Sequence, residues 1–227
     1  MVWLVTQTVT LADGSTEQVL VPQLYAVVRE GDLSNTGALL SGSSVNINLS
    51  GDLTNTGTIA GRNVVSVAAD NINNLGGRIT GHDVVAQART DLDNIGGQIS
   101  ANNSLLASAG RDINVTSTTQ STQTSTTSYT GIDRVAGLYV TGANGTLVAA
   151  AARDMNLTAA AISSTGTATL QAAGNLNLQA LTESQNINTT RDADNYTRMA
   201  QSQSVGTTVQ ASNALTLSAG APVSRTP

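Results

Sequence analysis

The stretch GDLTNTGTIAG, residues 51–61, is one of four closely related segments that follow one another along the chain. The segment before it reads GDLSNTGALLSG (31–42), and the two after it read NINNLGGRITG (71–81) and DLDNIGGQISA (91–101). Successive copies therefore begin 20 residues apart. A fixed period of this length is typical of solenoid proteins, in which each copy forms one unit that stacks on the previous unit.

Three kinds of residue keep their place from one copy to the next. Asparagine tolerates tight turns, and its amide can hydrogen-bond to an identical amide stacked above it. Glycine permits a turn with positive φ, and stacked aliphatic side chains fill a narrow interior. The asparagines are Asn35, Asn55, Asn74 and Asn94, the glycines are Gly37, Gly57, Gly76 and Gly96, and the aliphatic residues are Leu39, Ile59, Ile79 and Ile99. We predict that the asparagines and the aliphatic residues form side-chain ladders.

These rows predict an all-β fold, a right-handed parallel β-helix with coils of about 20 residues. Each coil is expected to hold two or three short strands of about three to five residues, stacked on the next coil at ordinary strand spacing. A leucine-rich horseshoe is the main alternative fold. Its repeats need more leucine and a helical segment, so the β-helix fits the sequence better.

The composition of the chain supports narrow β-structure. The 227 residues include no Cys, no Phe, one Trp and four Tyr, whereas Ala, Val, Thr, Ser, Asn and Gly are abundant, a mixture that suits strands and tight turns. The formal net charge is −5 and every positive charge is an arginine, with no basic run of the kind that binds nucleic acid. No apolar stretch approaches the roughly 20 residues that span a bilayer. We expect neither a nucleic-acid partner nor a membrane-spanning segment.

The pattern divides the chain into four parts. We expect an N-terminal β-hairpin or cap with a turn at Asp13-Gly14, in which Pro22 lies at an edge or bulge. Two polar excursions then interrupt the later coils, as flexible loops or as β-hairpins, before the chain rejoins at GLYVTG and TTVQA. The expected boundaries are 1–30 for the hairpin, 31–115 for regular coils, 116–220 for coils with excursions at 116–130 and 182–206, and 221–227 for a tail.

Several of these segments, taken in order, resemble a known family. GDLTNTGTIAG, NINNLGGRITG, SLLASAGRDINV and AARDMNLTAAAI are similar to the haemagglutinin repeats of the filamentous haemagglutinins and contact-dependent growth-inhibition exoproteins of Gram-negative bacteria. The excursions followed by VGTTVQASNALTLSAG resemble the more C-terminal repeat region of such proteins. The likeness covers roughly residues 20–220.

The resemblance implies export by two-partner secretion through a dedicated outer-membrane transporter, followed by display on the bacterial cell surface. It implies adhesion through a host or bacterial cell-surface receptor, or delivery of a C-terminal toxin to a neighbouring bacterium. The chain would be an internal fragment of such a protein. The catalytic residues of the family lie in toxin modules, so none is carried over to this sequence.

Acidic side chains at the turns give little support for catalysis. Asp32 and Asp52 are expected to stack, but the same position becomes Asn71 before it returns to Asp91, which relieves like-charge repulsion. Polysaccharide-cleaving β-helices need clustered carboxylates at a groove. We expect a structural row instead. Further acidic residues are Asp112 along the row and Asp70, Asp83, Asp133 and Asp154 at other turns.

The remaining candidates for chemistry are isolated. Arg111 and Arg153 are each followed by Asp and are expected to form ion pairs at turns. His82 lies beside Asp83, but neighbouring residues of a strand point apart. The cluster RDADNY (191–196) lacks the spacing of a calcium loop. We expect no catalytic residue, no metal site and no cofactor.

Three tyrosines lie in or beside the excursions, namely Tyr129, Tyr139 and Tyr196. They are candidates for partner contact, and packing of an excursion onto the coils explains them equally well. The favoured function is a non-catalytic structural and interaction module. The alternative is a carbohydrate-binding or polysaccharide-cleaving β-helix.

Overall fold

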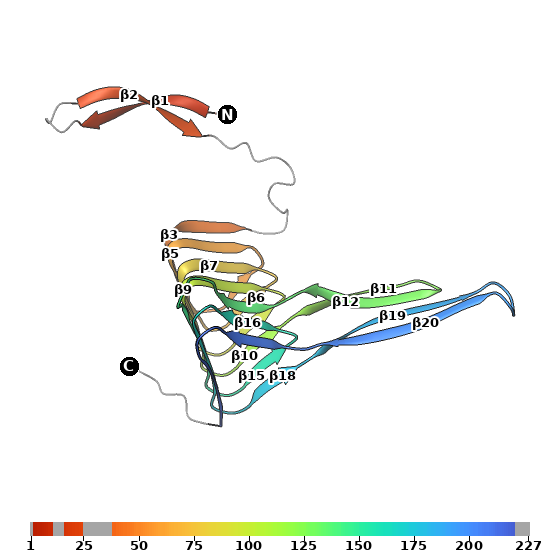
Figure 1. Cartoon of the computed structure of the whole chain (residues 1–227). Coiled ribbons are helices and arrows are strands. Elements are labelled where there is room, and N and C mark those ends of the chain that lie inside the picture. Colours follow the sequence, from red (N-terminus) through yellow and green to blue (C-terminus); the bar gives the residue numbers. More distant parts are fainter. Residues whose placement is uncertain (1, 11–15, 25–37, 221–227) are drawn as a thin grey trace. The chain divides into compact units, whose positions relative to one another are not determined.

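The computed structural model describes residues 2–10, 16–24 and 38–220 (Figure 1). The chain divides into two compact units, Met1–Thr36 and Gly37–Pro227. The described residues form strands and turns with no helix, which confirms the all-β prediction. They contain no helix with the length and apolarity needed to cross a bilayer.

The first unit contains a β-hairpin. Strands β1 (Val2–Thr10) and β2 (Thr16–Leu24) pair antiparallel, with Thr10 opposite Thr16. Pro22 lies opposite Leu4. Both strands are edges of a two-stranded sheet, so Pro22 interrupts no ladder to a further strand. The predicted turn at Asp13-Gly14 lies outside the described residues.

A six-stranded parallel sheet runs through the second unit. Each strand pairs with the next one in chain order, without a register shift between residues. The strands are β4 (Leu53–Asn55), β6 (Ile72–Leu75), β8 (Leu92–Ile95), β10 (Ile113–Thr116), β15 (Met155–Thr158) and β18 (Leu176–Gln179). The sheet is thus built from one short strand per repeat.

A ten-stranded parallel sheet contains the other strands of the repeats. It begins with long strands and continues with short ones, because β9 pairs with β13 through its first half and with β14 through its second half. The long strands are β3 (Leu39–Asn48), β5 (Thr58–Ala69), β7 (Arg78–Ala88) and β9 (Gln98–Ala109). The short strands are β13 (Gly137–Val140), β14 (Thr146–Ala151), β16 (Ala161–Ser164), β17 (Thr167–Ala172), β21 (Thr208–Ala211) and β22 (Leu215–Ala219).

The prediction of strands of three to five residues is wrong for the first repeats, where β5 has 12 residues. The register shifts between Ala60 and Val64 where β5 pairs with β7, and between Gly81 and Asp83 where β7 pairs with β9. Neither shift ends the strand. A bulge bends and twists a strand locally while the pairing resumes beyond it. One bulged strand therefore replaces two short ones.

Aliphatic rows fill the space between the sheets. Ile59, Ile79 and Ile99 are buried and occupy equivalent positions of β5, β7 and β9. The row continues through Leu138 and Ile162, which are also buried. The predicted first member is wrong, because Leu40 and not Leu39 pairs with Ile59. The shift follows from the extra residue in that copy, LLSG against IAG.

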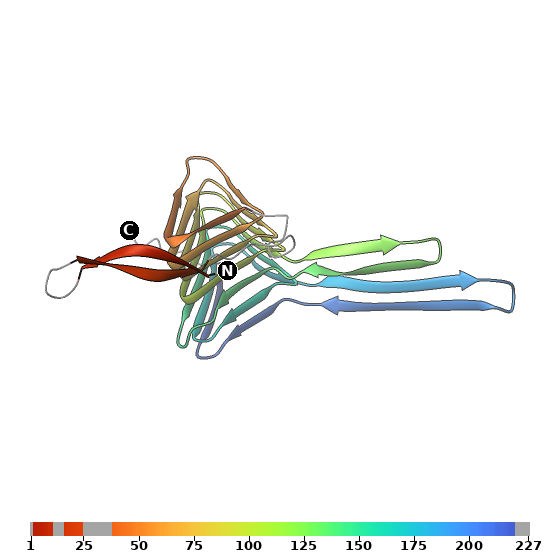
Figure 2. The ribbon, with the colours of Figure 1, turned by 90° about the horizontal axis from the view of Figure 1, so that it is seen from above.

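Both polar excursions form β-hairpins that extend away from the parallel sheets (Figure 2). The first consists of β11 (Thr118–Gln123) and β12 (Thr127–Arg134), and the second of β19 (Leu181–Thr190) and β20 (Tyr196–Val205). Strand β12 also pairs antiparallel with β19, so the two hairpins form one four-stranded sheet in the order β11-β12-β19-β20. We call it the hairpin sheet. The chain returns to the ten-stranded sheet at β13 and at β21.

Candidate functional site

A ladder of asparagine amides runs beneath the turns that follow the short strands of the six-stranded sheet. The Asn55 Nδ2 donates to Asn74 Oδ1 at 2.8 Å, and the Asn74 Nδ2 donates to Asn94 Oδ1 at 2.7 Å. All three side chains are buried. At the end of the ladder the Asn94 Nδ2 donates to the Gly137 carbonyl, and the next residue in the row is Val115. Asn35 lies outside the described residues.

Two consecutive glycines follow the ladder residue in two of the repeats, Gly76-Gly77 and Gly96-Gly97. Gly76 and Gly96 have φ of 67° and 59°, the left-handed region that favours glycine. Gly77 and Gly97 are needed for space, because a Cβ on either one would overlap two amides of the ladder. In each repeat, the first glycine is therefore needed for its positive φ and the second for space. Only the first requirement is visible in the sequence, as a turn signal.

A second polar row runs along the turns that precede the same strands. Each member except the last, Asn175, accepts a hydrogen bond at its side-chain Oδ1 from the backbone N–H of the member in the next repeat. The row consists of Asp52, Asn71, Asp91, Asp112, Asp154 and Asn175. Asp154 belongs to this row and not to another turn as predicted, because the first hairpin lengthens the interval before it. Asp32 lies outside the described residues.

Arginines neutralise the row where carboxylates follow one another. Arg111 forms a two-pronged ion pair with Asp91, and Arg153 forms one with Asp112. The hydrogen bond from Arg111 is the main cause that holds the pKa of Asp91 below its ordinary value. Both Asp91 oxygens therefore accept hydrogen bonds from the protein.

Other acidic residues are also hydrogen-bonded within the repeats. Asp70 pairs with Arg89 at 3.0 Å. Asp83 accepts hydrogen bonds from Ser104 and Asn103, and the Ser104 bond is the main cause that lowers its pKa. Thr118 donates to Asp133 at the base of the first hairpin.

The hairpin sheet has two different faces. Cross-strand pairing places Tyr129, Gln185 and Gln201 on one rung of the first face, with Ile187 and Met199 on a neighbouring rung. The opposite face carries mostly small polar residues. Its members include Ser121, Ser128, Thr130, Ser184, Asn186, Ala200 and Ser202. Where the β12–β19 ladder ends, Glu183 accepts a hydrogen bond from the Ile132 N–H at 2.9 Å.

The three candidate tyrosines do not gather in one place. Tyr129 lies over Gly131 on β12 and is 50% exposed. Tyr196 begins β20, is 57% exposed and has the guanidinium of Arg198 5.0 Å from its ring centre. Tyr139 lies in the ten-stranded sheet, where burial raises the pKa of its phenol. Only Tyr129 and Tyr196 belong to the hairpin sheet.

The acidic cluster at 191–196 forms the tip of the second hairpin. The Oδ1 of Asp192 accepts hydrogen bonds from the backbone N–H groups of Asp194 and Asn195 and from the Asn195 amide. These bonds are the main causes that lower the pKa of Asp192. Across the described part of the chain, no three His, Cys, Asp or Glu side chains come together as a metal ion would require.

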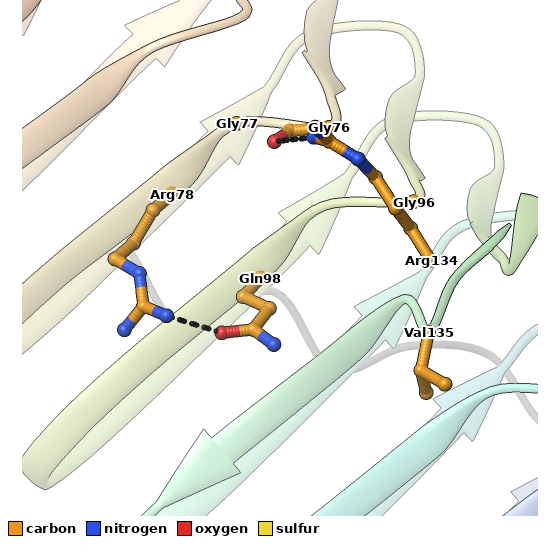
Figure 3. A pocket seen from close by; sticks show the side chains of 7 residues that line it. All are labelled: Gly76, Gly77, Arg78, Gly96, Gln98, Arg134 and Val135. Atoms are coloured by element: carbon orange, nitrogen blue, oxygen red, sulfur yellow. Dashed lines mark hydrogen bonds between the residues drawn. The ribbon is translucent and has the colours of Figure 1, made fainter. Parts of the chain in front are cut away.

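A cleft of about 260 Å³ lies where the first hairpin leaves the parallel sheets (Figure 3). Its lining residues are Gly76, Gly77, Arg78, Gly96, Gln98, Arg134 and Val135. The Arg78 Nη2 donates to Gln98 Oε1, and the Arg134 Nη1 donates to the Gly76 carbonyl, both at 2.8 Å. We call it the arginine cleft. No motif in the sequence indicates this cleft, because Arg134 reaches a turn 58 residues earlier in the chain.

No protein-family model, curated protein or solved structure matches this chain.

Proposed function

We propose that residues 38–220 form a right-handed parallel β-helix that serves as a rigid, non-catalytic segment of a bacterial cell-surface exoprotein. In this proposal the segment belongs to the filamentous haemagglutinin and contact-dependent growth-inhibition family. It acts in adhesion or in delivery of a C-terminal toxin to neighbouring bacteria.

The β-helix is supported by the order of the parallel strands. In the six-stranded sheet, strand order equals chain order from β4 to β18, as expected when each repeat stacks on the previous one. Crossovers between parallel strands of one sheet are right-handed in about 98% of cases, which favours the right hand. A crystal structure tests this directly, and a left-handed course between successive strands of the six-stranded sheet would contradict it.

The functional proposal rests on one observation: a repetitive interior supports an exposed sheet made from two separate insertions. Polar side chains inside the repeats hydrogen-bond to one another in ladders, as Asn55, Asn74 and Asn94 do. In contrast, every described residue from Thr189 to Ser204 is exposed. Polar, exposed insertions on a rigid scaffold are where binding residues are commonly found. The hairpin sheet is therefore the part of the segment that we assign to receptor contact.

Adhesion of coated beads tests this assignment. Beads carrying the purified chain are incubated with bacterial or host cells and counted after washing. The matched control is a variant in which residues 183–203 are replaced by a short Gly-Ser turn, because Leu181 and Val205 already lie opposite each other. We expect adhesion of the intact chain and its loss in the variant. Equal adhesion by both would overturn the role of the second hairpin, and cleavage of a polysaccharide by the intact chain would overturn the non-catalytic assignment.

A further inference from the structure

The arginine cleft brings together two cations that have no acidic partner. Among the residues that the structure describes, the ion pairs are made by Arg89, Arg111 and Arg153. Arg78 and Arg134 both line the cleft, Arg78 beside Gln98 and Arg134 against Gly76 (Figure 3). No acidic residue lines the cleft. On a chain with a net charge of −5, the lining of this cleft therefore carries two positive charges and no negative one.

The polar side chains of the cleft offer donors to a ligand. A guanidinium has five N–H donors, and the hydrogen bonds within the cleft account for one from Arg78 and one from Arg134. Because the Gln98 Oε1 accepts the bond from Arg78, its Nε2 amino group remains as a further donor. The carbonyl of Gly76 is occupied by Arg134. A ligand that supplies acceptors, and above all negative charge, complements this arrangement.

The size and the remaining lining of the cleft limit the ligand. About 260 Å³ is slightly below the roughly 300–1,000 Å³ of pockets for drug-sized molecules. Gly76, Gly77 and Gly96 also line the cleft, and the exposed Val135 side chain adds an apolar wall. The planar fork of a guanidinium matches a carboxylate with two parallel hydrogen bonds.

We propose that the arginine cleft binds the carboxylate of a small polar ligand, of the size of an acidic monosaccharide such as a uronic acid. The inference adds a ligand class to the proposed adhesive segment and does not rest on its cellular location. It is tested on the purified chain, whereas adhesion is tested on cells with the hairpin variant, so failure of one leaves the other intact.

Titration of the ¹⁵N-labelled chain with sodium glucuronate, followed by NMR, tests the proposal. We expect saturable shifts of the Gly76, Gly77 and Gly96 amide signals at low salt, and weaker binding as salt screens the charges. Glucose serves as the uncharged comparison and is expected to cause no such shifts. Absence of saturable shifts by about 50 mM glucuronate, equal binding of glucose, or tighter binding of glucose 6-sulfate would overturn the carboxylate assignment.

Variants separate the cleft from general surface charge. We expect Arg78→Gln and Arg134→Gln each to weaken glucuronate binding about five- to tenfold, as for loss of one exposed charge-assisted hydrogen-bond partner. Arg62→Gln is the matched control, since Arg62 is exposed and does not line the cleft. Arg78→Lys keeps the charge without the planar fork and is expected to fall between wild type and Arg78→Gln. Unchanged affinity in both Gln variants, or an equal loss in Arg62→Gln, would contradict the proposal.

Discussion

Replacing Asn74 by Asp tests the amide ladder with a change of one atom. Asn74 is fully buried and makes three hydrogen bonds. It accepts from Asn55 at 2.8 Å and donates to the Gly77 carbonyl at 3.0 Å and to Asn94 Oδ1 at 2.7 Å. In Asn74→Asp an oxygen replaces the donating nitrogen. Two buried acceptors then lose their donor and face another oxygen.

The size of the effect depends on pH. Each buried acceptor left unsatisfied costs about 1–3 kcal/mol, so two cost about 2–6 kcal/mol, which is comparable with a typical stability of about 5–15 kcal/mol. Burial raises the pKa of the new carboxyl above its unfolded value of about 3.9. A protonated carboxyl restores one donor, so the loss is smallest below about pH 3.9 and grows as the pH rises.

The assay is urea unfolding followed by far-UV circular dichroism at pH 3 and pH 7. We expect the difference in free energy of unfolding between wild type and Asn74→Asp to be several kcal/mol larger at pH 7, on the order of the penalty above. Asn102→Asp is the control, because Asn102 is exposed. A loss of the same size at both pH values, or a variant as stable as wild type, would refute the role of the ladder.

Three further outcomes are expected. Ile79→Asp should unfold the chain at 25 °C or lower its melting temperature severely, because it places an unpaired charge in a dry aliphatic row. Ser66→Asp is the control and should have little effect. Similar melting temperatures of the two variants would show that the row is misplaced. The pKa of Asp91 is lowered in the folded chain. Its contribution to the free energy of unfolding is therefore present above the unfolded pKa of about 3.9 and is lost as the pH falls through the folded pKa. The melting temperature of Asp91→Asn should depend less on pH between about pH 2 and 5 than that of wild type. Replacement of 183–203 by a Gly-Ser turn should leave the far-UV spectrum β-rich and alter melting only modestly, and collapse of the spectrum would show that the second hairpin is needed for the parallel sheets.

The repeat in the sequence predicted the parallel strands well because equivalent residues lie beside each other. Ile79 pairs with Ile59 and Ile99 in the ten-stranded sheet, so a residue type that recurs every 20 positions also recurs in space. The segment VVSVAA (64–69), with a composition that also suits a helix, lies in a strand for the same reason. The position of Leu40 was missed because that copy is one residue longer than the next, which moves the paired leucine by one position.

The hairpin sheet could not be predicted from the sequence. Strands β12 and β19 pair with Tyr129 opposite Gln185, but neither strand has a hydrophobic alternation that would identify its partner. The first hairpin follows β10 and the second follows β18, and only β15 lies between these two strands in the six-stranded sheet. The arginine cleft was missed for a related reason, since Arg134 reaches Gly76 only after the first hairpin has folded back.

The strand order of the six-stranded sheet has a consequence for how the chain assembles in time. Each new strand adds to the edge formed by the strand before it, so its partner is already in place when the chain emerges from one end. In the early repeats the loop to be closed stays at about 20 residues however many repeats follow, and its entropic cost does not grow with chain length. Folding can therefore advance repeat by repeat, behind the end of the chain that emerges first. The pairing of β12 with β19 must wait longer, because it joins Thr130 to Ser184 after two further strands of the six-stranded sheet have been laid down.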